Sequence, residues 1–283
     1  MDFHYLLARI EDAPFESRPF RHLFITDFLS PDHFRQIVSA PEVVLPPCTS
    51  DQELVKRLAS AGYEPIVFPG TTNSVNDYLE WHRTRSGANQ NQITCEGLGI
   101  VFRLKTRTSP ILEELHRFIA SETFLGTLGE KFGIDIAGVT VEHGLQKYLD
   151  GYEISPHPDI RKKALTWMVN VNPAPDSERI NYHTHYMEFV PERRYVMEYW
   201  RHNLDADTCW VPWGWCTTVT RQTPNNSIVV FKPACDTMHA VIAKYDHLAT
   251  QRTQFYGNLW YRDVPKRKRR SSRTSKSPPP AGW

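Results

Sequence analysis

The sequence lacks any long uninterrupted hydrophobic run. Runs such as Ser227-Ile-Val-Val-Phe231 are far shorter than the roughly 20 apolar residues of a membrane-spanning helix. The five cysteines show no Cys-x-x-Cys spacing, which argues against a disulfide framework or a zinc knuckle. The N-terminus lacks the basic segment and apolar run of a secretory signal peptide. We therefore expect a protein of the reducing cytoplasm that has no membrane partner.

A strong excess of one charge is also missing, although the charge is unevenly distributed. Residues 265–283 hold seven Lys or Arg and no acid, while the remaining residues hold 26 basic and 32 acidic side chains. Such a mildly acidic body gives no indication of a broad nucleic-acid surface. The basic tail has too few apolar residues to fold, so we predict that it is disordered. Its run 266–270 resembles a nuclear-localisation or nucleic-acid patch, and the alternative is a solvated end that helps solubility.

The first half of the chain has the pattern of helices. A strand and a helix are predicted within residues 20–40, where Ser30 is suited to the N-cap and Pro31 to the first helical position. Apolar residues at three- and four-residue steps predict helices over 50–62 and 108–133. The Gly, Asn, Thr and Ser content of residues 66–100 predicts a long loop region.

From about residue 138 short β-rich runs replace the helical pattern. They are 139–142, 164–171, 227–231 and 254–261, and turn signals separate them. Helices followed by short strands predict a mainly β barrel or jelly roll with N-terminal helices against it. We expect one domain over 1–264, with a helical part to about residue 137 and a β core over 138–264, followed by the tail. The oligomeric state stays open.

The strongest chemical signal is His157-Pro-Asp159, which follows a predicted strand and a glycine turn. Much later, His239 follows another strand and its loop. Two imidazoles and one carboxylate on neighbouring strands of a barrel form a facial triad that suits non-haem Fe(II). This set leaves three coordination positions free, of which a bidentate 2-oxo acid can take two and O₂ the third.

A 2-oxo dicarboxylate bound to such an iron needs a cation for its far carboxylate. Arg252 opens the strand that follows His239 and could supply a bidentate guanidinium. Arg221 and Lys244 are the competing cations.

One ordered set of residues carries a family resemblance. Its members are Tyr148, Gly151, His157, Asp159, Thr166, Asn172, Phe231, Pro233, His239 and Arg252. In this order they resemble the Fe(II)- and 2-oxoglutarate-dependent oxygenases of the prolyl 4-hydroxylase-like branch, over residues 140–262 and the opening segment 20–40. The resemblance implies a double-stranded β-helix (jelly-roll, cupin-like) core and a dependence on Fe(II), 2-oxoglutarate and O₂. It implies His157, Asp159 and His239 as iron ligands, and Arg252, Tyr148 and Thr166 as co-substrate residues.

Asp159 bears on the type of reaction, because halogenating relatives have a small residue at this position. We therefore expect a dioxygenase that hydroxylates an unactivated C–H bond and releases succinate and CO₂. The expected substrate is a small molecule, such as an amino acid, a sugar derivative or a natural-product intermediate. The alternatives are a hydroxylase of protein or peptide side chains, and a non-catalytic jelly-roll module that binds a metal or ligand.

The long segment between Asp159 and His239 is predicted to contain a lid insertion over 177–223. Its tryptophans Trp210, Trp213 and Trp215 could form a substrate platform or could anchor the loop by packing. His183 and His185 have the spacing of a metal-binding pair, but we interpret them as lid or surface residues because a complete triad exists elsewhere.

Overall fold

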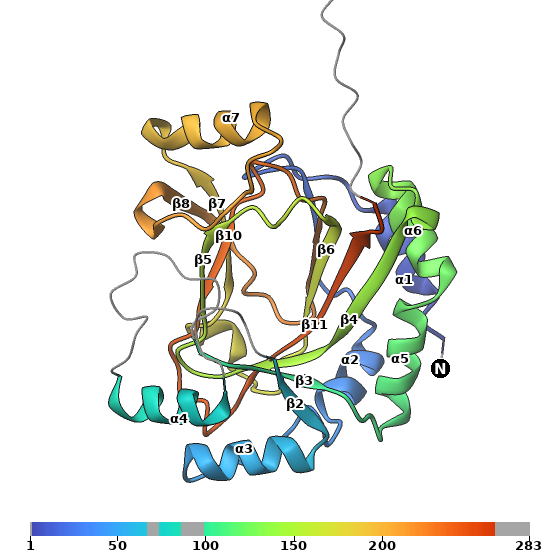
Figure 1. The fold of residues 1–283 in the computed structure, drawn as a ribbon. Coiled ribbons are helices and arrows are strands. Elements are labelled where there is room, and N and C mark those ends of the chain that lie inside the picture. The colour runs from blue at the N-terminus through green and yellow to red at the C-terminus, as the bar shows by residue number, and fades with distance from the viewer. Residues whose placement is uncertain (1, 67–73, 86–98, 264–283) are drawn as a thin grey trace, which may run out of the picture.

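The computed structural model describes residues 2–66, 74–85 and 99–263, and these form two antiparallel sheets (Figure 1). The larger sheet has the strand order β1 (His22–Ile25), β9 (Ile228–Phe231), β6 (Lys163–Asn170), β11 (Arg252–Tyr261), β4 (Val139–Tyr148), β3 (Val101–Leu104) and β2 (Tyr63–Ile66). The smaller sheet has the order β5 (Glu153–His157), β10 (His239–Ile242), β7 (Thr184–Phe189) and β8 (Cys216–Arg221).

From β4 onward the chain passes back and forth between the two sheets. Strands β4, β6, β9 and β11 join the larger sheet, and β5, β7, β8 and β10 join the smaller one. This is the strand order of a double-stranded β-helix, or jelly roll. The mainly β fold class with N-terminal helices is therefore confirmed.

The helices of the N-terminal part pack mainly against the larger sheet, and the last α-helix lies beside the smaller sheet (Figure 1). The α-helices are α1 (Tyr5–Asp12), α2 (Pro31–Val38), α3 (Asp51–Ser60), α4 (Val75–Thr84), α5 (Pro110–Ile119), α6 (Glu122–Phe132) and α7 (Arg194–His202). The described residues also form the short 3₁₀ turns η1 (Ile136–Gly138), η2 (Ser177–Arg179), η3 (Pro191–Arg193) and η4 (Trp213–Trp215). The N-cap predicted at Ser30 is confirmed, because its hydroxyl oxygen accepts the backbone N–H of His33 at 3.2 Å.

Side chains along the central strands point alternately into the apolar core and into the barrel interior. On β11, Phe255 and Leu259 pack into the main apolar core with the helices. Arg252 and Gln254 on the same strand face the interior cavity. Because successive side chains of a strand point to opposite faces, one strand serves both the core and the site.

Three sequence predictions need correction. The predicted loop region 66–100 contains α4, and the predicted helix 108–133 is two helices, since Ser121 caps a new one at Phe124. The predicted lid insertion 177–223 contributes β7 and β8 to the smaller sheet. Only its segments 177–183, 190–215 and 222–223 lie outside these strands. The predicted disordered tail 265–283 lies outside the described residues, and the rest of the predicted domain division stays a prediction.

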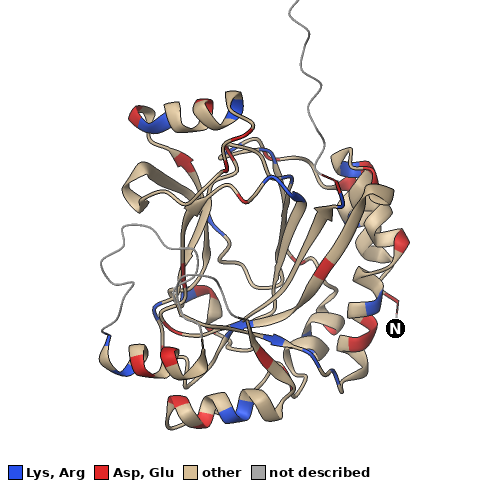
Figure 2. Cartoon of the chain, in the orientation of Figure 1, with Lys and Arg blue, Asp and Glu red and all other residues tan. Residues whose placement is uncertain are grey.

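Charges of both signs are interspersed along the helices (Figure 2). Among the described residues, no helix is long and apolar enough to cross a membrane.

Candidate metal centre

Two neighbouring strands of the smaller sheet bring the predicted metal ligands together. His157 ends β5, His239 begins β10, and the two are direct partners in the register of the sheet. Asp159 follows with a backbone φ of 66°, an uncommon conformation for a residue other than glycine. The Nε2 atoms of His157 and His239 lie 3.7 and 4.0 Å from the two Asp159 carboxylate oxygens. One donor atom from each residue lies within 4.8 Å of the others, and all three residues are buried.

Hydrogen bonds fix the orientation of both imidazoles. Nδ1 of His157 donates to the carbonyl of Ser155 at 2.8 Å, and Nδ1 of His239 donates to the carbonyl of Thr237 at 3.0 Å. A carbonyl can only accept, so each Nδ1 carries a proton, and Nε2, the nitrogen that faces Asp159, is the one available to a metal. Burial, with His157 close by, lowers the pKa of His239 to about 3, which keeps this ring in the neutral form that binds metals.

The Asp159 carboxylate is held ionised by its neighbours. Burial alone would raise its pKa, but Lys163 and the two imidazoles outweigh burial, so the pKa of Asp159 lies well below its ordinary value. The Lys163 Nζ lies 2.6 Å from one carboxylate oxygen, and the Thr166 hydroxyl donates to the other at 2.8 Å. Thr166, predicted as a co-substrate residue, therefore contacts the carboxylate of a predicted iron ligand.

The three residues line one cavity of about 340 Å³ together with Arg252, Tyr148, Thr166 and Trp210. Arg252 is only 2% exposed. Its Nη2 donates to the Thr184 hydroxyl at 2.8 Å and to the Gln254 side-chain oxygen at 2.9 Å. Its guanidinium carbon lies 4.4 Å from the centre of the Tyr148 ring.

Arg252 nevertheless has a guanidinium nitrogen that forms no hydrogen bond with the described residues. Its Nη1 is buried without a hydrogen-bond partner, and no carboxylate of the described chain forms an ion pair with it. A buried cation without a counter-ion is costly, so this arrangement calls for an anion. The competing cations Arg221 and Lys244 are exposed and do not line this cavity.

The three predicted substrate tryptophans have different surroundings. Trp210 lines the cavity, and its ring lies 6.1 Å from that of His157. Trp213 donates from Nε1 to Glu153 at 2.6 Å, and Trp215 lies 4.7 Å from the Arg193 guanidinium. Both pack against the apolar cluster beneath α7 and are not among the residues that line the cavity.

The interpretation of His183 and His185 as lid or surface residues is wrong. Both are buried, and His185 belongs to β7, where its Nδ1 lies 2.9 Å from the Thr218 hydroxyl. Neither belongs to the cluster of His157, Asp159 and His239.

The sequence reasoning missed a charged wall of the same cavity. Arg103 donates to Glu142 at 2.7 Å, and the Trp260 indole donates to the other Glu142 oxygen at 3.0 Å. The Lys163 ammonium lies 5.5 Å from the centre of a Trp260 ring. Alternation of polar residues along β4, with Glu142 and Tyr148 on the same face, was the signal that could have found this wall.

The fold and site define a jelly-roll protein with a buried His-Asp-His cluster. No family model and no curated protein sequence matches the chain. Among solved structures, a prolyl-4-hydroxylase from Pseudomonas putida is 10% identical, over 91% of this chain and 98% of that chain, with a TM-score of 0.46. A prolyl hydroxylase from Trichoplax adhaerens, in complex with a hypoxia-inducible-factor peptide fragment, is 10% identical over 90% and 86%, with a TM-score of 0.43. The epimerase SnoN, in complex with Fe³⁺, alpha-ketoglutarate and nogalamycin RO, is 13% identical over 92% and 86%, with a TM-score of 0.42. At this level of similarity the chemistry of the chain has to be argued from its own residues.

Proposed function

We propose that the protein is an Fe(II)- and 2-oxoglutarate-dependent dioxygenase that hydroxylates a C–H bond of a small molecule. One observation carries the proposal: a buried cluster of two imidazoles and a carboxylate shares a cavity with a buried arginine that lacks a counter-ion. The first feature fits Fe(II), and the second fits the far carboxylate of the co-substrate.

The donor set fits the metal. His157 and His239 would each bind through a neutral Nε2, and Asp159 would add one negative charge. Three protein donors leave positions for a co-substrate and O₂. A carboxylate at Asp159 also leaves no place for a halide ligand, which favours hydroxylation over halogenation.

The opposite end of the cavity fits 2-oxoglutarate. The free Nη1 of Arg252 and the Thr184 hydroxyl would hold the far carboxylate, above the ring of Tyr148. A charge-assisted bond from a buried guanidinium is strong and directional, so it would orient the 2-oxo acid end toward the metal ligands. Lys163 and Thr166 would hold the Asp159 carboxylate in place for the metal.

Iron bound between these residues, with 2-oxoglutarate, would supply the oxidising chemistry: O₂ would be consumed, the co-substrate would give succinate and CO₂, and one oxygen atom would enter a substrate C–H bond. The chain would bind and orient the reactants and exclude water. A cavity of about 340 Å³ is at the small end of the range for ligand sites, and the co-substrate would fill part of it. This supports a small substrate, such as an amino acid, a sugar derivative or a natural-product intermediate.

The test is a screen of such compounds with Fe(II), 2-oxoglutarate and O₂, read out by succinate and by product mass. Hydroxylation adds one oxygen atom to the product, whereas an isomer of unchanged mass would replace hydroxylation by epimerisation. An Asp159→Ala variant and a metal-free reaction are the matched controls. If purified protein makes no succinate with iron under any condition, including without substrate, the chain is a non-catalytic module and the proposal is wrong.

A further inference from the structure

A second, partly buried polar cluster lies outside the cavity, and we name its four residues the anchor cluster: Asp51, His82, Asp150 and His247. Nδ1 of His82 lies 2.9 Å from Asp51, and its Nε2 lies 3.0 Å from Asp150. Nε2 of His247 lies 2.6 Å from the other Asp51 oxygen, and the two imidazoles stack with centroids 4.7 Å apart. The cluster joins α3, α4, the turn after β4 and the loop before β11.

Hydrogen-bond geometry assigns the protons of both rings. Each nitrogen of His82 faces a carboxylate oxygen, and Nη2 of Arg85, which can only donate, also lies 3.0 Å from Nε2. The pKa of His82 lies above its ordinary value, which favours the imidazolium that donates to both carboxylates. In His247, Nδ1 accepts the backbone N–H of Asp150 at 2.8 Å, which leaves the proton on Nε2 to be donated to Asp51. His247 is therefore neutral in this arrangement.

The same geometry argues against a metal in the anchor cluster. The donor atoms of Asp51, His82 and His247 lie close enough together to hold an ion. However, the imidazole nitrogens that face the carboxylates lie 2.6 to 3.0 Å from the Asp51 and Asp150 oxygens, which are hydrogen-bond distances, whereas the imidazoles of the candidate metal centre lie 3.7 and 4.0 Å from Asp159. In the described structure, hydrogen bonds hold the Asp51 and Asp150 carboxylates to the rings.

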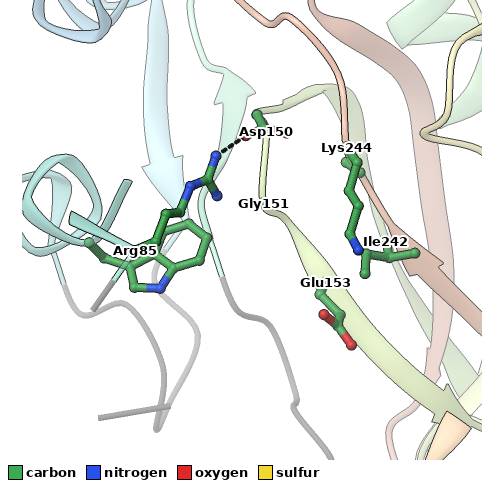
Figure 3. Close-up of a pocket in the computed structure, with 8 residues that line it drawn as sticks. Arg85, Asp150, Gly151, Glu153, Ile242 and Lys244 are labelled. Atoms are coloured by element: carbon green, nitrogen blue, oxygen red, sulfur yellow. Dashed lines mark hydrogen bonds and ion pairs between the residues drawn. The ribbon is translucent and has the colours of Figure 1, made fainter. Parts of the chain in front are cut away.

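Helix α4 and its C-terminal residue Arg85 make further contacts with the turn after β4. Arg85 pairs with Asp150 at the edge of a pocket of about 380 Å³ (Figure 3). Gly151 has a φ of 79°, and a Cβ there would lie 2.3 Å from the indole of Trp81. Tyr78, which is fully buried, donates to the Asp150 carbonyl at 3.0 Å. The position of this turn therefore depends on α4.

A short chain of hydrogen bonds leads from the turn to Arg252. The backbone N–H of Tyr245 donates to Asp150 at 3.0 Å, and the backbone N–H of Arg252 donates to the Tyr245 hydroxyl at 2.9 Å. The Tyr245 hydroxyl in turn donates to the carbonyl of Tyr148, whose ring lies under the Arg252 guanidinium. Asp150 is thus linked to Arg252 and Tyr148, two of the residues that line the proposed co-substrate end of the cavity.

We infer that the anchor cluster holds the Arg252 end of the cavity in place, and that His82 is a positioning residue for binding of 2-oxoglutarate. The inference rests on the proposed function. His82 lies outside the cavity and acts through Asp150, Tyr245 and Tyr148.

The test is His82→Gln, which keeps the approximate volume but cannot donate to both carboxylates. We expect the apparent KM for 2-oxoglutarate to rise about tenfold, the coupling expected between residues of one network, with kcat changed less than about twofold. Backbone hydrogen exchange should quicken in α4 and in the turn 149–152. His116→Gln is the matched control, because this partly buried histidine on α5 contacts neither the anchor cluster nor the cavity.

The pH profile gives a readout that a merely structural role would not change. Burial lowers the pKa of His82, but Asp150 and Asp51 outweigh burial, and the pKa lies above its ordinary value of 6.5 in spite of Arg85. Stabilisation by the His82 imidazolium is therefore complete below pH 6.5 and is lost as the pH rises through the folded pKa. The other titratable groups at the cluster are Tyr78, Tyr245 and His247. We expect the wild-type KM to rise with pH over this range and the His82→Gln KM to stay flat by comparison.

Three results would overturn the inference, and they are distinguishable. If wild-type protein turns over 2-oxoglutarate and His82→Gln has the same KM and pH profile, the anchor cluster does not position the co-substrate. If His116→Gln raises the KM equally, the effect is a general loss of stability. If wild-type protein neither binds nor turns over 2-oxoglutarate, the proposed function fails and this inference fails with it.

Discussion

Replacement of Arg252 by Met tests the proposed co-substrate site most directly. Met keeps an unbranched side chain but removes the charge and all guanidinium donors. Loss of one partner of a buried charge-assisted pair costs about 2–5 kcal/mol, which corresponds to a rise of about 30- to 4,000-fold in the apparent KM for 2-oxoglutarate. The burial of Arg252 and its free Nη1 place the expected value above the lower limit.

The same substitution should have little effect on folding. Removal of a buried cation without a counter-ion is favourable by a few kcal/mol at most, on the order of 1–4 kcal/mol for related replacements. Against this, Thr184 and Gln254 each lose a donor, at about 1 kcal/mol or more apiece. These opposing contributions should leave the free energy of unfolding within about 2 kcal/mol of wild type.

The assay is succinate formation against 2-oxoglutarate concentration at saturating Fe(II), together with urea unfolding of the same preparations. Arg221→Met is the control, because Arg221 is an exposed cation outside the cavity. A KM for Arg252→Met within about threefold of wild type, with the protein folded, would refute the assignment. So would an equal rise for Arg221→Met.

Four further substitutions test separate parts of the structure. His239→Ala removes one of three donors, so anaerobic titration should show metal affinity at least about 100-fold weaker, and unchanged affinity would place the third ligand elsewhere. Trp210→Ala should lower the amount of product formed per succinate, with both measured in the same reaction. Trp213→Ala should mainly lower the free energy of unfolding, by about 2 kcal/mol. The reverse result would contradict the assignment of Trp210 to the cavity. Glu42 accepts backbone N–H groups at the start of α5, so Glu42→Gln should destabilise the fold by about 2 kcal/mol in urea. Burial raises the pKa of Glu42, but the Ser109 hydroxyl, the Thr108 hydroxyl and these N–H groups outweigh burial and lower the pKa from 4.5 to about 2. The contribution of Glu42 to stability should therefore fade as the pH drops from 4.5 toward 2, and the same acid profile in Glu42→Gln would exclude this contribution.

The three residues of the candidate metal centre could be predicted from the sequence because their signal is largely local. His157 and Asp159 are two residues apart at the end of a strand, and the structure brings His239 beside them as a register partner. Arg252 was predicted from its place at the start of the next strand, and the structure brings it to the same cavity. The roles of these residues stay predictions until the substitutions are measured.

The lid prediction was too wide for a physical reason. Strand β8, Cys216–Arg221, is the edge of the smaller sheet and pairs with β7 alone. An edge strand that is half exposed can carry Thr and Arg and needs no apolar alternation, so its sequence resembles that of a loop. Strand β7 also carries His185 and Glu188, which masked its place in the barrel.

The anchor cluster had no local signal at all. The pair Asp51 and His82 is separated by 31 residues, His82 and Asp150 by 68, and Asp51 and His247 by 196. No spacing within one element connects them, and each alone is an ordinary polar residue at an element end. Only the packing of α4 against the barrel brings these residues together.

Strand register couples the stability of the core to the geometry of the candidate site. A slip of one residue along β11 would exchange its two faces, so that Thr253 would enter the cavity and Arg252 would meet the helices. Gly257 opposes this slip, because it pairs with Trp167 and a Cβ at Gly257 would lie 2.1 Å from the indole. Any residue moved into that position would collide with a fully buried tryptophan. The contact between Gly257 and Trp167, on the outer face of the sheet, therefore helps to fix where Arg252 lies on the inner face.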